Sequence, residues 1–554
     1  MRTALRLLLA AVGLGSLLPT GAAAQTGRLD TGFGQGGVAT TPMGLERNTD
    51  FAMDAAVLSD RRVVVGGTVD NDDGPMGLGL ARYLPSGELD PSFGDGGRVV
   101  TTRFPSALNA WAMLRQPDGR LLVGGSMCDG SPCDMTVVRY TADGALDGTF
   151  GDGGFARVEF PPCGDERRRG TVSDLALDGS GRIVAAGNAC TGSSGSSTDA
   201  AVIRLRDDGS LDDTFGEGGR AWIDLGDFGS AAASVAVDGQ GRIVLGGTTD
   251  LGETPNVAAR LTPAGRPDPS FDGDGLRLFR LEGMGSIVHQ VGVLPDDRVV
   301  LGGVAIIDAV AGAWFVRRLA VDGSDDVSYD GDGTAFLRHP TKDAALGMLV
   351  AADGSVTLSG QRYEEGRGSH MAVGRLTPSG AVDGAFGDGG VTFIPSAEES
   401  LGTALAAGPG GSLVVTGWSG SQEDRYVFAT ARLLGDGSSS LPPPAPEVGD
   451  APLRIPVRNG ARVKLRRNGT FALRLGPFVE QASGRVEMLR GTRRFAARDF
   501  TVERYGTVNV RLRASRRVRR LARRRGGVRV SARLTARDVR ARYAARRFAF
   551  RLVR

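Results

Sequence analysis

The chain has 554 residues, 41% of them hydrophobic, and a formal net charge of +3. A hydrophobic fraction of this size is ample for a buried core and argues against disorder throughout the chain. With 85 glycines against 6% aromatic residues, the composition indicates many tight turns, either in several domains or in one repeat array with a smaller companion.

The first 24 residues have the pattern of an export signal. Arg2 and Arg6 give a basic start, residues 7–18 are apolar, and the small residues of "GAAAQ" predict cleavage after Ala24. A membrane anchor fits less well, because the apolar run is short and Pro19 interrupts it. We therefore expect a protein that is secreted or associated with the cell envelope, without a transmembrane segment.

Residues 25–440 carry one glycine-rich phrase seven times, with "LDPSFGDGG" at 89–97 as an example. Its aromatic residue recurs every 56 to 65 residues, at Phe33, Phe93, Phe150, Phe215, Phe271, Tyr329 and Phe386. Each unit also contains short valine- and isoleucine-rich runs that end in glycine, such as "GRLLVGG" at 119–125. Runs of this length, bounded by Asp-Gly and glycine turns, are typical of β-strands.

The repeat predicts an all-β fold, a seven-bladed β-propeller over residues 25–440 with about four strands per blade. Several runs lack polar alternation, which indicates that neighbouring blades cover both faces of each strand. A parallel β-helix is the alternative. Its rungs are usually shorter than these units, and they need no Asp-Gly hairpins.

An arginine precedes the aspartate of the phrase by eight residues in six junctions. The pairs are Arg82 and Asp90, Arg139 and Asp147, Arg204 and Asp212, Arg260 and Asp268, Arg318 and Asp326, and Arg375 and Asp383. The planar guanidinium of an arginine leaving one strand can bind the carboxylate that opens the next connection. Because the pair recurs from unit to unit, we interpret it as an internal clamp and not as a ring of ligand-binding groups.

The stretches "LDPSFGDGGRVVTT", "QPDGRLLVGG" and "VVRYTADGALDGTFGDGG" resemble the delta-60 repeat of bacterial secreted and surface proteins, and the resemblance covers about 29–440. It implies a propeller-like fold without a common established activity, so it brings no catalytic residues to this chain. The junction "DDVSYDGDG" at 325–333 departs from the pattern, which leaves the packing at that junction open.

A serine- and proline-rich linker is expected at 441–452, and the composition changes after it. Residues 453–554 contain 30 arginines and one lysine against five acidic residues, a net charge of +26 that leaves −23 for residues 1–450. Alternating runs at 461–476, 506–515 and 547–554 predict a small antiparallel Ig-like β-sandwich, with a short helix over 515–527 ended by Gly526. This segment is similar in style to the small β-sandwich domains that end many actinobacterial exported proteins.

Motifs that carry chemistry are scarce in this sequence. The three histidines, His289, His339 and His370, lie in different units without metal-ligand spacing, so we interpret them as isolated residues. No nucleophile elbow, zinc-protease motif or phosphate loop occurs. The "DNDDG" at 70–74 and the "DGDG" at 272–275 and 330–333 suggest calcium loops, but the distal bidentate glutamate is missing. We therefore expect Asx-type turns and no cofactor, with calcium as the weaker alternative.

The four cysteines are expected at one end of the propeller, where the loops between the first and second and between the third and fourth strands of a unit meet. Cys128 and Cys133 share one loop of the second unit, whereas Cys163 and Cys190 lie in two loops of the third. An exported protein permits oxidation, which predicts the bonds Cys128–Cys133 and Cys163–Cys190. Free thiols are the alternative, since geometry can forbid closure.

Loops at the same end differ in length and content between units, as specific recognition on a rigid scaffold requires. The candidate ligand-facing residues there are Asp72, Asp73, Glu364 and Glu365. The opposite end is built from repeated turns that hardly differ between units.

Two classes of function remain. The first is a non-catalytic secreted binding or structural protein, expected to be a monomer, whose basic C-terminal domain attaches it to an anionic cell-wall polymer, a polysaccharide or a surface protein. The negative array is an alternative partner for that domain. Dedicated nucleic-acid binding is not expected, since interleaved aromatic residues are few. The second class is a polysaccharide lyase or hydrolase with acidic residues in the mouth of the propeller; the lack of catalytic motifs favours binding.

Overall fold

The computed structural model describes two compact units, Met1–Pro444 and Ala445–Arg554, whose boundary falls within the predicted linker. In the first unit it describes residues 26–43, 49–70, 75–103, 106–130, 132–162, 169–190, 198–223, 230–249, 256–306, 312–338, 344–364, 368–396, 399–421 and 425–435. In the second it describes residues 462–464, 470–475, 482–490, 493–502, 508–513, 528–538 and 543–553. The predicted signal at 1–24, the linker at 441–452 and the helix at 515–527 therefore lie outside the described residues.

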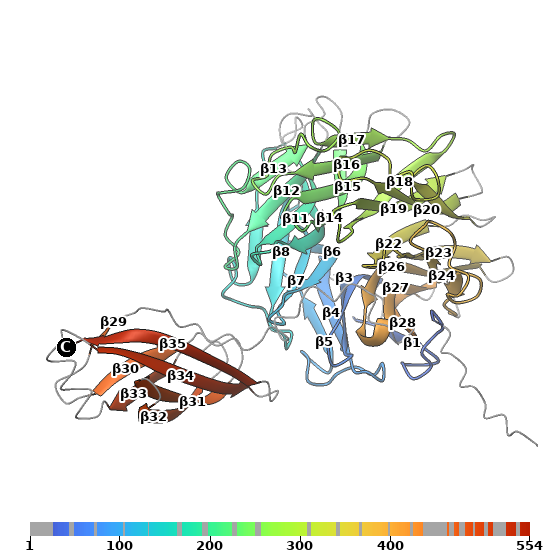
Figure 1. Cartoon of the computed structure of the whole chain (residues 1–554). Helices are drawn as coiled ribbons and strands as arrows, with labels where there is room; N and C mark the ends of the chain where they lie inside the picture. Colours follow the sequence, from blue (N-terminus) through green and yellow to red (C-terminus); the bar gives the residue numbers. More distant parts are fainter. Residues whose placement is uncertain are drawn as a thin grey trace, which may run out of the picture. The chain divides into compact units, whose positions relative to one another are not determined.

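The first unit is a β-propeller of seven antiparallel four-stranded sheets (Figure 1). Blade one contains β2 (Asp50–Val57), β3 (Val63–Val69), β4 (Gly77–Tyr83) and β5 (Arg98–Thr101). Blade two contains β6 (Ala107–Arg115), β7 (Leu121–Cys128), β8 (Cys133–Tyr140) and β9 (Phe155–Val158). Blade three contains β10 (Gly170–Leu177), β11 (Ile183–Ala189), β12 (Asp199–Leu205) and β13 (Arg220–Ile223). Blade four contains β14 (Ser230–Val237), β15 (Ile243–Thr249), β16 (Asn256–Leu261) and β17 (Leu276–Phe279).

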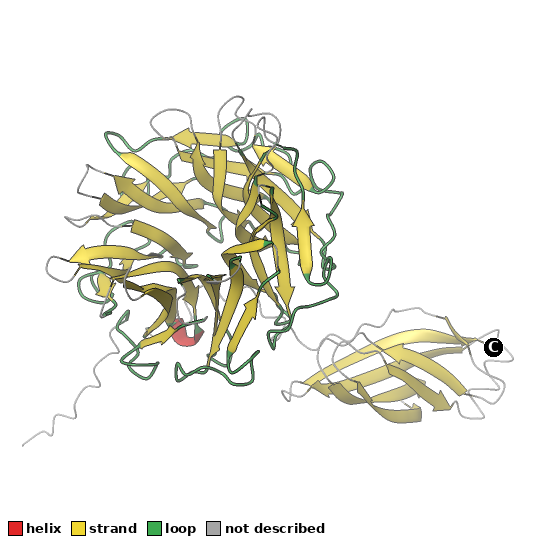
Figure 2. Cartoon of the chain, turned by 180° about the vertical axis from the view of Figure 1, so that it is seen from behind, coloured by secondary structure: helices red, strands yellow, loops and turns green. Residues whose placement is uncertain are grey.

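The remaining blades follow the same order. Blade five contains β18 (Gly285–Val293), β19 (Val299–Ile306), β20 (Gly312–Leu319) and β21 (Thr334–Arg338). Blade six contains β22 (Ala344–Val350), β23 (Val356–Glu364), β24 (Gly368–Leu376) and β25 (Val391–Phe393). Blade seven contains β26 (Glu399–Ala407), β27 (Leu413–Ser421), β28 (Arg425–Leu433) and β1 (Val38–Thr41), with the single-turn 3₁₀ helix η1 (Pro409–Gly411) between β26 and β27 (Figure 2). The prediction of seven blades with four strands each is confirmed, and the β-helix is excluded.

The ring is closed by a strand from the start of the chain. β1 pairs with β28, so that Val38 lies opposite Ala431 and Thr41 opposite Phe428. The sequence unit and the structural blade are therefore out of phase: the first strand of each unit is the outer strand of the preceding blade. The first strand of each blade is the inner strand (β2, β6, β10, β14, β18, β22 and β26), and these seven strands contact one another in a closed ring around the axis.

Every inner strand contains a one-residue bulge, and the bulge explains the glycine that ends each hydrophobic run. In blade four the register shifts between Ala232 and Ser234, and Gly247 of β15 lies opposite Ala232. A Cβ at Gly247 would stand only 1.9 Å from the carbonyl oxygen of Ala231. The same close approach, of 1.7 to 2.0 Å, occurs at Gly67, Gly125, Gly187, Gly303 and Gly417. Only glycine fits beneath the bulge.

The hydrophobic core consists of layers between neighbouring blades. Between blades three and four, for example, Val184 and Val202 pack with Val235 and Leu245 in one buried cluster. The aromatic residue of each phrase contributes to these layers, and all seven are at most 1% exposed. The strands read as continuous apolar runs because both faces are covered.

The predicted arginine clamps form at all six junctions, with Nε–Oδ2 distances of 2.6 to 2.8 Å. A seventh pair, Arg432 and Asp30, completes the set at 2.8 Å. Each guanidinium also lies over the aromatic ring of its phrase, 4.4 to 4.8 Å from the centroid. The junction that departs from the pattern packs like the others, because Tyr329 takes the place of phenylalanine beneath Arg318.

Each clamp joins two blades. Arg82 of blade one donates from Nη1 to the carbonyl oxygen of Ala142 in blade two, at 2.7 Å. Burial alone would raise the pKa of such an aspartate, but hydrogen bonds from Thr214 and the ion pair with Arg204 together lower the pKa of Asp212 to about 2. Asp212 therefore stays ionised and bound to Arg204 at neutral pH.

The C-terminal unit contains a five-stranded sheet in the order β29, β35, β34, β31, β32 and a two-stranded sheet of β30 and β33. Its strands are β29 (Arg462–Lys464), β30 (Thr470–Leu475), β31 (Ala482–Arg490), β32 (Arg493–Val502), β33 (Val508–Arg513), β34 (Val528–Asp538) and β35 (Tyr543–Val553). β29 pairs with β35 in parallel, so the five-stranded sheet is mixed. The prediction of a purely antiparallel arrangement is therefore wrong. The Ig-like sandwich packing stays a prediction.

Candidate functional site

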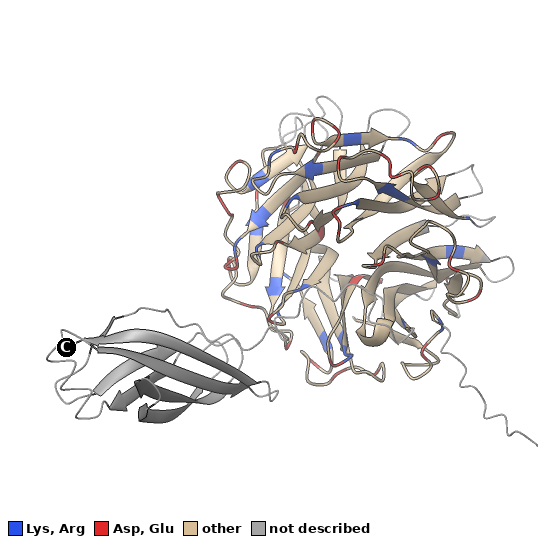
Figure 3. Cartoon of the chain, viewed as in Figure 1, with Lys and Arg blue, Asp and Glu red and all other residues tan. Residues whose placement is uncertain are grey.

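The two ends of the propeller differ in what they offer to a ligand. The turn end contains the tight turns between inner and second strands and the repeated phrases, whose arginines and aspartates are bound within the clamps. The loop end contains the connections between second and third strands and the passages from one blade to the next. Figure 3 shows arginine recurring along the strands of successive blades, while acidic residues lie mostly in the connections. Since the turn end repeats, chemistry that differs between blades must be sought at the loop end or along the axis.

The predicted ligand-facing carboxylates are mostly outside the described residues. Asp72, Asp73 and Glu365 are not described, and Glu364 is the last residue of β23, with its side chain not described. That these residues face a ligand stays a prediction.

The histidines are not brought together in the described part of the chain. His289 is the bulged residue of β18 in blade five, His370 lies in β24 of blade six, and His339 is not described. At the two "DGDG" turns, Asp274 accepts from the amide of Leu276 and Asp332 from that of Thr334, so Asx-type turns form as predicted. Among the described residues no group of three potential metal ligands was found.

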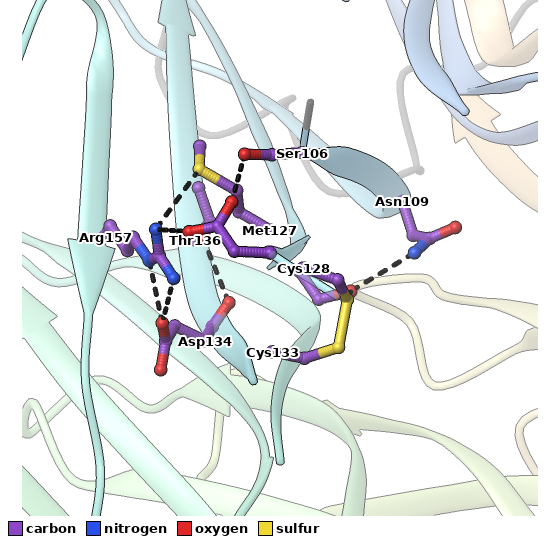
Figure 4. Close-up of a disulfide and its surroundings, with 10 residues drawn as sticks. Ser106, Asn109, Met127, Cys128, Cys133, Asp134, Thr136 and Arg157 are labelled. Carbon is purple, nitrogen blue, oxygen red and sulfur yellow. Dashed lines mark hydrogen bonds and ion pairs between the residues drawn. A yellow bond between two sulfur atoms is a disulfide. The ribbon is translucent and has the colours of Figure 1, made fainter. Parts of the chain in front are cut away.

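A predicted disulfide shapes one loop of the loop end (Figure 4). Cys128 ends β7, Cys133 begins β8, and their Cα atoms are 4.1 Å apart across the bond. The guanidinium of Arg157 binds Asp134 at 2.6 Å and Asp129 at 2.5 Å. Hydrogen bonds from Ser106 and Arg157 lower the pKa of Asp129. The loop is thus held covalently and by ion pairs.

The second predicted disulfide is only partly within the described residues. Cys190 is buried and disulfide-bonded, but Cys163 is not described. The pairing of Cys163 with Cys190 therefore stays a prediction.

Two aspartates interrupt the repeat symmetry along the axis. At the position after the bulge, Asp54 of blade one and Asp174 of blade three stand where blades two, six and seven have Ala112, Gly347 and Ala404. The equivalent residues of blades four and five are Ser234 and Gln290. These four polar residues form an axial polar arc, which sequence reasoning missed because they are scattered over more than two hundred residues. Alignment of the seven units at the bulge is the signal that could have found it.

The arc ties neighbouring inner strands together. Asp54 Oδ2 accepts from the backbone amide of Met113 in the next blade at 2.9 Å. Asp174 Oδ2 accepts from Ser234 Oγ at 2.6 Å and from the amide of Val235 at 2.8 Å. Both carboxyl groups are thus engaged across a blade boundary, as a structural bridge would be.

Burial changes the acidity of these carboxyl groups. It raises the pKa of Asp54 to about 7, an effect that the backbone bond from Met113 reduces and the negative charge of Asp174 increases. Burial also raises the pKa of Asp174. A carboxyl group that titrates near neutral pH can transfer protons. Trp111, the bulged residue of the inner strand β6, is 51% exposed.

The pocket at the loop end lies between blades six and seven, has a volume of about 310 Å³, and is called the blade 6/7 pocket here. The polar residues of its described lining are Thr40, Ser396, Ser400, Ser419 and Arg425. Met371, Ile394 and Val427 contribute apolar walls, and the described part of the lining contains no carboxylate. The pocket adjoins the place where the ring closes, since Thr40 comes from β1.

A chain of hydrogen bonds orders the hydroxyls on one wall of this pocket. The backbone amide of Met371 donates to Ser400 Oγ at 2.8 Å. Ser400 Oγ lies 3.1 Å from Ser396 Oγ, which lies 2.9 Å from Nδ1 of His370. Either hydroxyl can donate in the bond between Ser396 and Ser400, while Ser400 Oγ also accepts from the backbone. The wall is therefore a preorganised row of donors and acceptors.

Four segments of the chain match the model of a family described as "Domain of unknown function (DUF5122) beta-propeller", at residues 58–93, 116–150, 179–215 and 241–271. The match and the seven-bladed architecture agree on a β-propeller. No curated protein matches the sequence. No helix in the described part of the chain is long and apolar enough to cross a membrane.

Solved structures with similar folds have low sequence identity. A protein of unknown function from Dyadobacter fermentans is 13% identical, covers 72% of this chain and 99% of its own, and has a TM-score of 0.37. A polysaccharide lyase of family PL25, an ulvan lyase, is 8% identical over 71% and 98% of the two chains, with a TM-score of 0.36. A subtype N10 neuraminidase-like protein of A/little yellow-shouldered bat/Guatemala/060/2010 is 8% identical over 60% of this chain and 96% of its own, with a TM-score of 0.34. At these TM-scores the three proteins do not discriminate between enzyme and binding protein.

Proposed function

We propose that this protein is a secreted, non-catalytic binding protein of the delta-60 repeat type, which holds its ligand at the loop end of the propeller. The blade 6/7 pocket carries this proposal: its described lining includes three serines and a threonine, together with Arg425. Such a lining can recognise a polar ligand, and the carboxylate pair that glycoside hydrolysis generally uses is not among its described residues. Recognition on variable segments of a rigid scaffold is a common arrangement.

We further propose that residues 453–554 attach the protein to an anionic surface. Their net charge of +26 attracts polyanions, within a reach that salt limits to about 8–10 Å near physiological ionic strength. Outside the cell, the acidic partners are cell-wall polymers, polysaccharides and surface proteins. The charge of −23 on residues 1–450 is a competing partner within the same chain.

The attachment is tested by comparing residues 25–554 with residues 25–440 on heparin beads and on purified acidic wall polymer. We expect the longer protein to be retained and to elute as salt rises, because the attraction is electrostatic. The shorter protein should be retained far less, because it lacks the charge of +26 on residues 453–554. Equal retention of both proteins, or retention that salt does not affect, would contradict the attachment.

A polysaccharide-active enzyme is the second candidate function, and the axial polar arc is the observation that favours it. The pKa of Asp54, raised to about 7 by burial, suits a group that exchanges protons at neutral pH. Incubation with an array of acidic and neutral glycans distinguishes the two candidates. Breakdown products that disappear in the Asp54→Asn variant would support the enzyme, and retention without breakdown would support the binding protein.

A further inference from the structure

We propose that the blade 6/7 pocket binds a single carboxylated sugar unit, a hexuronic acid, through Arg425 and the hydroxyls of the facing wall. This inference rests on the proposed binding function and names its ligand class. The pocket adjoins blade seven, whose outer strand, β1, comes from the start of the chain, whereas in the other six blades the outer strand follows the third strand in sequence. The repeat therefore does not require the same pocket at the other blade junctions.

Arg425 has the features of a ligand-binding group. It is half-buried in the lining of the pocket, and no ion pair or hydrogen bond of its guanidinium is found within the described part of the chain. Its backbone adopts a φ of 84°, in the left-handed region that non-glycine residues rarely use. Strained backbone of this kind is concentrated at functional sites. The clamp arginines, in contrast, are all paired.

The charge of the pocket selects a single carboxylate. Arginine is the residue best suited to bind a carboxylate with two parallel hydrogen bonds. One guanidinium, the single cation among the described lining residues, balances one negative charge. A phosphate or sulfate ester would instead be expected to meet several cationic or backbone donors. No carboxylate among the described lining residues opposes an anionic ligand.

The remaining lining suits a sugar ring. Ser396 and Ser400 form the ordered row with His370, and Thr40 and Ser419 add further hydroxyls. These groups can exchange hydrogen bonds with ring hydroxyls, while Ile394 and Val427 offer apolar surface to the C–H faces. A volume of about 310 Å³ is at the lower end for small-molecule sites, which fits one sugar unit and not an extended oligosaccharide.

The test measures binding of galacturonic acid and of galactose to residues 25–554 by calorimetry or by saturation-transfer NMR. These two sugars differ in one group, the carboxylate. We expect galacturonic acid to bind about tenfold or more tightly, because a hydrogen-bonded charge is added. Digalacturonic acid distinguishes the end of a polysaccharide from a free sugar acid: tighter binding of the dimer indicates the chain end, and equal binding the free acid.

Two matched variants locate the site. Arg425→Gly removes the guanidinium and relieves the positive φ, so it is not expected to unfold the blade. Arg61→Gly is the control, because Arg61 is another arginine with a positive φ, of 68°, in a turn of blade one. We expect Arg425→Gly to abolish the preference for galacturonic acid, Ser396→Ala to weaken binding of both sugars, and Arg61→Gly to leave binding unchanged.

The inference is overturned if galacturonic acid and galactose bind equally, if neither binds, or if Arg425→Gly binds galacturonic acid like the unmodified protein. Retention on acidic wall polymer reports separately on the C-terminal attachment, since Arg425→Gly leaves residues 453–554 intact. A protein that is retained but does not discriminate the sugars refutes the sugar site alone. Discrimination without retention refutes the attachment alone.

Discussion

Arg432 and Asp30 are 402 residues apart in the sequence, yet Nε of Arg432 donates to Oδ2 of Asp30 at 2.8 Å. The same guanidinium donates from Nη1 to the carbonyl oxygen of Pro85 at 2.7 Å and lies 4.8 Å from the centroid of the Phe33 ring. One side chain thus connects β28, the third strand of blade seven, with the first phrase and with the turn that follows β4 in blade one. It is the clamp that closes the ring.

The first prediction concerns this closure. Arg432→Lys removes the planar fork, so the partly buried Asp30 keeps one flexible partner and the carbonyl of Pro85 loses its donor. We expect a loss of about 3 kcal/mol in the free energy of unfolding, which corresponds to a decrease in Tm of roughly 3 °C for a domain of this size. Calorimetry measures it, with the exposed Arg266→Lys as control. An equal Tm for Arg432→Lys and Arg266→Lys would contradict a role of Arg432 in closing the ring.

The second prediction concerns the glycine beneath the bulge. Gly247→Ala places a methyl group 1.9 Å from the carbonyl oxygen of Ala231, so β14 and β15 must separate. We expect a loss of about 3 kcal/mol, at the upper end for overpacking. Gly179→Ala is the control, because a Cβ there meets nothing within 4 Å, and it should change the free energy of unfolding by less than about 0.5 kcal/mol. Denaturant unfolding compares them; equal stability would refute the steric explanation.

The third prediction concerns pH. The pKa of Asp54 is about 7 in the folded protein against an ordinary value of 3.8, so between these values the folded state holds more protons than the unfolded state. The stabilising contribution of Asp54 is therefore complete below about pH 4 and is lost as the pH rises through about 7. As the pH rises from 5 to 8, the Tm of the unmodified protein should fall relative to the Tm of Asp54→Asn.

The comparison with Asp54→Asn cancels the other groups that titrate in this range. Burial lowers the pKa of His289, which acts in the opposite direction, and raises that of Asp174. Both are present in the two proteins. If the Tm of the unmodified protein minus the Tm of Asp54→Asn stays constant, or rises with pH, the raised pKa of Asp54 is contradicted.

The fourth prediction concerns the cysteines. Cys128 and Cys133 are five residues apart, so their bond restricts the unfolded chain only slightly, by about 2 kcal/mol. We expect the double variant Cys128→Ser/Cys133→Ser to remain folded, because Arg157 holds both Asp129 and Asp134 beside the loop. Peptide mapping without reduction should also find Cys163 bonded to Cys190. A peptide that joins Cys163 to Cys128 or Cys133 would refute that pairing.

Much of the fold could be predicted from the sequence, because it depends on interactions between residues that are close together in the chain. The period of the phrase, the valine-rich runs and the Asp-Gly turns predicted the strands and the number of blades, because each of these signals acts within a few residues. The arginine eight residues before an aspartate predicted six clamps for the same reason. The seventh clamp escaped, since Arg432 and Asp30 are neighbours only after the ring has closed.

Tertiary structure decided what depends on residues far apart in the chain. The bulge opposite Gly247, the exchange of the outer strand between units and the meeting of Asp54 and Asp174 around the axis arise from packing seven blades in a circle. The blade 6/7 pocket likewise joins Thr40 to Arg425, from opposite ends of the propeller sequence. Sequence by itself determined the repeating unit, because hydrogen bonding and burial within a blade are local. Only the closed ring determined the singular sites, because they form where non-equivalent residues of distant units meet.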